Sequence, residues 1–70
     1  MTLKEAVVGK EYKVRNIAVD DNDMESFLFS LGCYSGEPVT VISHLRGSSI
    51  VSIKDGRYSI DNRLASAIYV

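Results

Sequence analysis

The sequence predicts a mainly β protein, a small and strongly bent barrel with one short α-helix inserted after the first strand. Apolar–polar alternation typical of half-buried strands occurs before the helix and recurs in three later runs, with turn residues between them. So many short strands in 70 residues cannot form a two-sheet sandwich of normal size, whereas a small barrel leaves few unpaired edges. No linker, repeat or low-complexity tract divides the chain, so residues 1–70 are expected to form a single domain.

The N-terminal segment predicts a helical turn followed by a strand. Thr2 and Glu5 have the spacing of a capping box, which favours a brief helical turn, and Gly9 is expected to end it. Residues 11–19, EYKVRNIAV, alternate apolar and polar side chains. This alternation predicts one strand with one buried face and an irregularity near Asn16.

Residues 21–32 change to the helical period. Asp21 or Asn22 can cap this helix, and Gly32 is expected to end it in the left-handed conformation that glycine adopts at least cost. The apolar stripe of the helix consists of Met24, Phe27, Leu28 and Leu31. The acidic residues around its N-terminus are Asp20, Asp21, Asp23 and Glu25. They suit the positive end of the helix dipole, and because a calcium site needs six or more converging oxygens, a structural role is favoured.

The second half of the chain predicts three strands, at residues 38–45, 48–54 and 57–61. Asp55–Gly56 is a hairpin signal of the type that needs positive φ at both turn positions. The LRGS segment at residues 45–48 is expected to form a looser hairpin loop.

The C-terminal segment predicts a helical turn and a short strand. Asp61 or Asn62 can cap one turn over residues 61–65, DNRLA. The last residues, AIYV at 67–70, then indicate a final strand.

Composition limits the classes of partner. Eight basic and nine acidic side chains give a net charge of -1, so no broad attraction to nucleic acid or to an anionic membrane is expected. One cysteine cannot form an internal disulfide, and the chain opens on MTLKEA without the features of a signal peptide, so a reducing cytoplasm is expected. No apolar run approaches the roughly 18 residues of a membrane span, so any service to a membrane would come from the aqueous side.

Side chains able to do chemistry are few. Cys33 and His44 are the only soft metal ligands, whereas a structural zinc site needs four ligands and a catalytic one usually three. The same pair lacks an oxyanion loop and a third orienting group, so no catalytic residue and no enzyme activity are expected. The glycines stand singly, so no phosphate-binding loop and no cofactor are expected. His44 ends a strand at a loop and is expected to be solvated.

Aromatic residues are the remaining candidates for function. Phe29 lies about 140° around the helix from the first residue of the apolar stripe, so the pattern leaves open whether it is exposed or buried. Tyr34 and Tyr69 could gather with other aromatic side chains on one side of the barrel. Tyr12 and Phe27 are expected in the core, because a small barrel uses its aromatic side chains to thicken that core.

Glycines and apolar residues follow one another in a characteristic order. The pattern consists of Leu3, Gly9, Val14 and Ile17, then LFSLG in the helix, then Gly36, Val39 and Val41, then GSSIVSI, and finally YSIDNRLASAIYV. It covers almost the whole chain and resembles the FeoA family, the small cytoplasmic proteins of bacterial ferrous iron transport systems.

The resemblance implies an SH3-like β-barrel with a helical insertion and without catalytic residues or cofactors. It also implies a cytoplasmic accessory protein that docks on the cytoplasmic part of the FeoB transporter and modulates iron uptake, without inserting into the membrane. A homo-oligomer is compatible with this interpretation. Similar domains lie at the end of the chain in iron-dependent transcriptional repressors, so a nucleic-acid or transcription accessory module is the alternative. It is disfavoured because Lys and Arg are dispersed over the elements.

The resemblance also bears on individual residues. Cys33 stands in a Gly-apolar-x-x-Gly loop where the family usually has leucine, so it is expected to be a small, inert core residue. The family often has arginines along the helix, where this chain has acidic and aromatic side chains, so contacts that depend on those arginines cannot be carried over. Phe29, with Tyr34 at the same end of the helix, is the expected partner-binding surface, for the transporter or for a second copy.

The expected burial of Cys33 can be tested. Cys33→Ala should cost about 1 kcal/mol of unfolding free energy through lost packing, and should leave partner binding intact. Cys33→Asp should unfold the protein, because it buries an unpaired charge. Thiol labelling in native buffer checks the placement: a rate as fast as in denaturant would put the sulfur on the surface and contradict the assignment.

Overall fold

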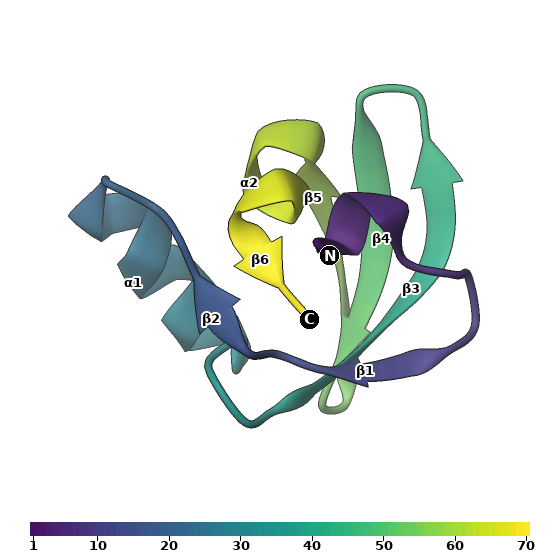
Figure 1. Ribbon diagram of the computed structural model, residues 1–70, viewed down its shortest axis with the longest axis horizontal. Coiled ribbons are helices and arrows are strands. Elements are labelled where there is room, and N and C mark those ends of the chain that lie inside the picture. Colours follow the sequence, from purple (N-terminus) through teal and green to yellow (C-terminus); the bar gives the residue numbers. More distant parts are fainter.

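The computed structural model describes residues 1–70 as six strands, two α-helices and one 3₁₀ helix (Figure 1). In chain order the elements are η1 (Leu3–Glu5), β1 (Glu11–Lys13), β2 (Asn16–Ile17), α1 (Asn22–Leu31), β3 (Pro38–Leu45), β4 (Ser48–Ile53), β5 (Gly56–Asp61), α2 (Asn62–Ala67) and β6 (Ile68–Tyr69). Hydrogen bonding arranges the strands in two antiparallel sheets, one ordered β1-β3-β4-β5 and one formed by β2 and β6. The mainly β class and the short helix after the N-terminal strands are confirmed.

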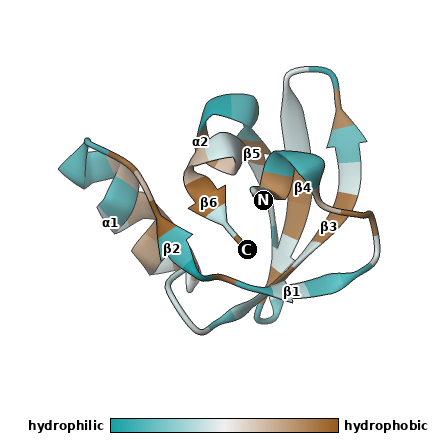
Figure 2. Cartoon of the chain, viewed as in Figure 1, coloured by the Kyte–Doolittle hydropathy of each residue, from teal (hydrophilic) through white to brown (hydrophobic).

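β3, β4 and β5 form an antiparallel meander that supplies much of the core. Hydrophobic and hydrophilic residues alternate along these strands (Figure 2), as expected for a sheet with one buried face. The side chains of that face are at most 1% exposed: Val39, Val41, Val51, Ile53 and Ile60. The register shifts between Val41 and Ser43, and such an irregularity increases the bend of a strand, which helps a small sheet to curve around its core.

The β4–β5 turn lies one residue earlier than predicted. Ile53 pairs with Gly56, so the two-residue turn is Lys54–Asp55. Positive φ occurs at Lys54, at 53°, and not at Gly56. Gly56 lies against the Tyr58 side chain, which would have to shift if position 56 carried a Cβ.

The β3–β4 turn is tighter than predicted. Leu45 pairs with Ser48, so Arg46–Gly47 forms a two-residue turn in place of a looser loop. Gly47 has φ 83°, a conformation that glycine adopts at little cost.

The single strand predicted over residues 11–19 is two strands in different sheets. β1 pairs with the start of β3, whereas β2 pairs with β6. Between them, Val14 N–H donates to the Glu37 carbonyl at 2.9 Å and Arg15 N–H donates to the Tyr69 carbonyl at 2.7 Å. The prediction of one strand was wrong because alternation of side chains continues through a corner at which the backbone changes pairing partners.

η1 places Leu3 in the core, where it is fully buried. Glu5 accepts hydrogen bonds from the Thr2 hydroxyl at 2.5 Å and from the Thr2 N–H at 3.1 Å, and these bonds hold the pKa of Glu5 below its usual range. The helical turn ends at Glu5, where Ala6 becomes extended, so the prediction that Gly9 ends it was wrong. Gly9 instead takes φ 85° in the turn that follows.

α1 begins and ends as the sequence predicts. The Asp21 carboxylate caps it and accepts a hydrogen bond from Asp23 N–H at 2.8 Å. Gly32 ends it at φ 90°, in the left-handed region. At the C-terminal side of the fold, Asp61 caps α2 in the same way, accepting from Leu64 N–H at 2.8 Å.

α1 lies beside the rest of the protein (Figure 1) and packs against it through a few apolar side chains. Leu28 is fully buried, while Met24 and Leu31 are half-buried against the core. Phe27 was expected in the core but is 46% exposed, because it lies about 100° around the helix from Leu28, on the shoulder of the stripe. Tyr12, also expected in the core, is half-buried against it.

The core contains one buried polar side chain, and a histidine satisfies it. Ser49 is fully buried, and its hydroxyl lies 3.1 Å from His44 Nδ1. His44 Nε2 donates to the Ala6 carbonyl at 2.8 Å. His44 is exposed at its strand end, as predicted, but its role was missed, since both ring nitrogens tie β3 to neighbouring segments.

Cys33 lies in the core, 1% exposed, as predicted. Burial disfavours the thiolate and raises the pKa of the Cys33 thiol from 9.0 to about 11.

This raised pKa predicts a loss of stability at alkaline pH. The thiol ionises near pH 9.0 in the unfolded chain and near pH 11 in the folded protein. The contribution of the buried neutral thiol to the unfolding free energy is therefore fully present below pH 9 and is lost as the pH rises toward 11. Across this window the unfolding free energy of the native chain should fall by on the order of 2 kcal/mol more than that of Cys33→Ala. Urea titrations of both proteins measure the difference, and parallel pH profiles would contradict it.

Candidate functional site

An aromatic pair stands at the C-terminal end of α1. Phe29 is 65% exposed, and its ring centroid lies 4.9 Å from that of Tyr34, with the two planes tilted by 31°. This separation is typical of favourable aromatic pairs. The left-handed turn at Gly32 reverses the chain, so Tyr34 returns alongside the last turn of the helix. The structure therefore brings together the two residues that the sequence placed at one end of the helix.

Lys54 reaches this pair from the β4–β5 turn. Its Nζ lies 5.6 Å from the Tyr34 ring centroid and 3.2 Å from Glu37 Oε1, in the only ion pair of the protein. The hydrogen bond from Lys54 lowers the pKa of the Glu37 carboxyl, and the same bond raises the pKa of Lys54. Exposed ion pairs contribute little stability, so the main effect of this pair is to hold the ammonium beside the ring. Phe29, Tyr34, Glu37 and Lys54 together are called the aromatic site below.

A hollow open to solvent runs between the aromatic site and the β4–β5 hairpin. One wall is formed by residues 29–32 and Tyr34, and the other by residues 53–56 and Tyr58. Gly32 lies directly beneath the Lys54 side chain, because a Cβ on Gly32 would come within 2.7 Å of the Lys54 Cε. The absence of a side chain at position 32 thus allows Lys54 to cross toward Tyr34 and Glu37.

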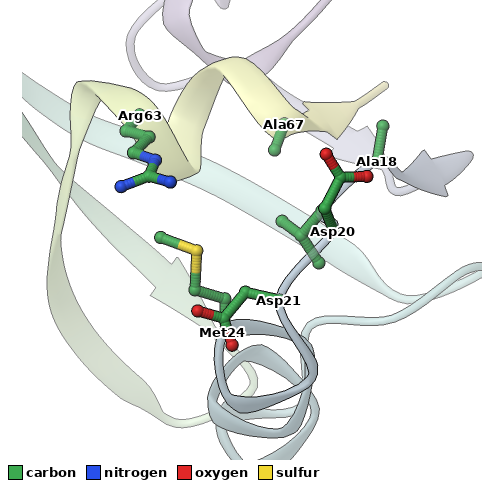
Figure 3. Close-up of a pocket in the computed structure, with 7 residues that line it drawn as sticks. Ala18, Asp20, Asp21, Met24, Arg63 and Ala67 are labelled. Atoms are coloured by element: carbon green, nitrogen blue, oxygen red, sulfur yellow. The ribbon is translucent and has the colours of Figure 1, made fainter.

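A second hollow separates α1 from α2 (Figure 3). Arg63 and Ala67 of α2 face Met24 and residues 18–21, which lead into α1. The Met24 side chain points toward the Arg63 guanidinium (Figure 3). Arg63 forms no ion pair with the aspartates of this segment. The hollow is mixed in polarity and holds no nucleophile with a base beside it.

Metal-binding side chains do not converge. No group of three or more His, Cys, Asp or Glu side chains is placed to hold a metal ion. Cys33 is buried, and both His44 nitrogens already contact protein atoms. No helix is long and apolar enough to cross a bilayer.

The sequence analysis missed three residues of the aromatic site and its adjoining hollow: Glu37, Lys54 and Tyr58. Lys54 and Glu37 are 17 residues apart, and no local pattern relates them. Tyr58 was assigned only to a strand, and its side chain lies over Gly56 in the structure. Tyr69 lies on β6 at 41% exposure and lines neither hollow, so it does not join the aromatic site.

The fold is that of a small SH3-like domain. A FeoA from Stenotrophomonas maltophilia, solved with zinc and described as a prokaryotic SH3 domain protein, has a TM-score of 0.85 at 20% identity, over 100% of this chain and 88% of that chain. Iron(II) transport protein A from Clostridium thermocellum has a TM-score of 0.87 at 18% identity, over 99% of this chain and 43% of that chain. A manganese-dependent transcriptional repressor has a TM-score of 0.86 at 22% identity, over 100% of this chain and 40% of that chain. At these identities the likeness shows the fold alone.

The chain belongs to the FeoA family, because the FeoA domain profile matches residues 1–70. A crystal structure of an iron uptake regulatory protein, FeoA, is 28% identical with a TM-score of 0.83, over 96% of this chain and 88% of that chain. No curated protein matches the sequence. The family is a small accessory domain associated with ferrous iron transport, and the resemblance inferred from the sequence is confirmed.

Gly32 and Gly36 provide a matched test of the aromatic site. Both have φ near +90°, but a Cβ would meet Lys54 only at Gly32, whereas Gly36 has open space. Alanine at either position should cost about 1–2 kcal/mol for the left-handed backbone. Only Gly32→Ala should displace Lys54, so the lowered pKa of Glu37 should return toward 4.5 in that variant alone. NMR titration of Glu37 measures this, and an unchanged pKa in Gly32→Ala would show that Lys54 does not depend on the glycine.

Proposed function

We propose that this FeoA protein is a non-enzymatic accessory protein of the cytoplasm, which docks on the cytoplasmic part of a FeoB-type ferrous iron transporter and modulates iron uptake. Family membership supports the link to ferrous iron transport. The observation that carries the docking role is Phe29, a large apolar side chain that is 65% exposed within a preformed aromatic site.

Exposure of Phe29 is better explained by binding than by folding. Apolar side chains that fold a protein are buried, whereas exposed aromatic side chains often become the centre of an interface. Tyr34 packs against the Phe29 ring, and Lys54 in turn lies beside Tyr34. Phe29 therefore loses less side-chain freedom when a partner covers it. The adjoining hollow beside Tyr58 offers a recess for a partner side chain.

The charge of α1 indicates the chemistry of the partner surface. The acidic residues in its first turn are Asp23 and Glu25, and its last turn contains no basic residue. Complementary charge speeds association and discriminates against wrong partners. The docking surface of the transporter is therefore expected to combine an apolar recess for Phe29 with basic side chains beside it.

Phe29 and Phe27 allow a controlled test, because both are exposed phenylalanines on α1 but only Phe29 belongs to the aromatic site. Phe29→Ser should weaken binding to the purified cytoplasmic region of the cognate transporter by about 2 kcal/mol, the scale of an interface hot spot. Phe27→Ser should change it by less than about 0.5 kcal/mol. Calorimetric titration, with and without guanine nucleotide, measures both affinities.

The stability of each variant decides how the binding data are read. The unfolding free energies of both variants should lie within about 1 kcal/mol of that of the native chain, because neither ring is buried. A loss of several kcal/mol in Phe29→Ser would mean that the ring belongs to the core. Equal binding by all three proteins would mean that docking uses another face.

A further inference from the structure

Lys54 has a backbone conformation that disfavours any residue with a side chain. It is the first residue of the two-residue β4–β5 turn, and it is the only residue other than glycine with positive φ, at 53°. Hairpin turns with positive φ at this position usually have glycine there, because a Cβ comes too close to the carbonyl oxygen that follows. In the β3–β4 turn the positive φ falls on Gly47. The β4–β5 turn therefore carries a strain that the other hairpin turn avoids.

The contacts of the Lys54 side chain do little to offset this strain. The side chain is 50% exposed, and its ammonium pairs with Glu37 at 3.2 Å. An ion pair or a cation–ring contact that is so open to solvent contributes little to stability. Folding alone therefore gives no strong reason for a lysine at position 54.

The same contacts connect the β4–β5 turn to Phe29. Lys54 Nζ lies 5.6 Å from the Tyr34 ring centroid, and the Tyr34 centroid lies 4.9 Å from that of Phe29. The Lys54 side chain reaches Tyr34 by crossing Gly32, the residue that ends α1. Because Phe29 is 65% exposed, the order of its side chain depends on its few protein neighbours.

We infer that Lys54 is a positioning residue for docking: it holds Tyr34 against Phe29, so that the exposed ring is already ordered when a partner arrives. This inference rests on the proposed docking role of Phe29. Ordering a mobile side chain opposes binding, and a contact that orders it in the free protein raises affinity without touching the partner. The strain at Lys54 is then retained for binding and not for folding.

Glycine and alanine at position 54 separate the effect of the backbone from that of the side chain. Both variants lose the contacts with Glu37 and Tyr34, but only Lys54→Gly removes the strain. The thermal midpoint of Lys54→Gly should therefore lie about 4–8 °C above that of Lys54→Ala, and close to or above that of the native chain. Both variants should bind the purified cytoplasmic region of the transporter roughly fivefold more weakly than the native chain. Arg46→Ala, which removes an unpaired cation from the other hairpin turn, is the charge control and should keep the native affinity.

A double variant distinguishes positioning from direct contact between Lys54 and the partner. If Lys54 acts through Phe29, Lys54→Gly should weaken binding in the native chain and cause no further loss in Phe29→Ser. Equal losses in the two backgrounds would mean that Lys54 meets the partner itself, and would overturn the inference. Native affinity in Lys54→Gly, with weakened binding in Phe29→Ser, would also overturn it while leaving the docking role of Phe29 in place.

The NMR spectrum of the free protein gives a readout that needs no partner. The neighbouring rings of Phe29 and Tyr34 shift each other's proton resonances. In Lys54→Gly and Lys54→Ala the Phe29 ring resonances should move toward those of an isolated phenylalanine, whereas Arg46→Ala should leave them in place. Unchanged Phe29 resonances in Lys54→Gly would overturn the inference. If Phe29→Ser binds as tightly as the native chain, the proposed docking fails, and these resonances alone decide whether Lys54 positions the ring.

Discussion

The buried face of the β3–β4–β5 meander is the constraint on which the rest of this structure depends. A chain of 70 residues has one small core, and its valine and isoleucine side chains must be covered by whatever short elements remain. η1 covers it with Leu3, and α2 with Leu64 and Ala65. β6 contributes Ile68 and also pairs with β2, which links the two ends of the chain to one core. Each covering element is short because the face that it covers is small.

The position of α1 follows from this arrangement. η1, α2 and β6 already cover most of the sheet, so α1 buries one side chain completely, Leu28, and leaves both shoulders of the helix in solvent. Two hollows result, one beside Tyr34 and Tyr58 and one beside Arg63. A helix that is not needed to fill the core is free to carry a recognition surface, and in this chain it carries an exposed phenylalanine and acidic side chains.

Distribution of charge matters more for this protein than its total. The net charge of -1 argues against broad attraction to any polyanion, yet acidic side chains gather at the start of α1. The SH3-like fold shared with a transcriptional repressor supplies the scaffold, and its surface side chains distinguish one role from another.

The sequence by itself determined the mainly β class and the bounds of α1, and it narrowed each helix cap to two neighbouring residues, Asp21 or Asn22 and Asp61 or Asn62, because each follows from residues close together in the chain. The burial of Cys33 was expected from the family pattern, and the structure confirms it. Tertiary structure decided the rest. The division of β1 from β2 is visible only in the folded chain, because the alternation of apolar and polar side chains is the same whether or not a strand changes its pairing partner. The exposure of Phe27 likewise depends on how α1 packs against the small core. Contacts between Lys54 and Glu37, and between His44 and Ser49, join residues from different strands or turns, and their geometry depends on how those segments pair. A local sequence pattern shows which face of an element is apolar, but the fraction of that face that is buried depends on all the other elements that pack against the same core.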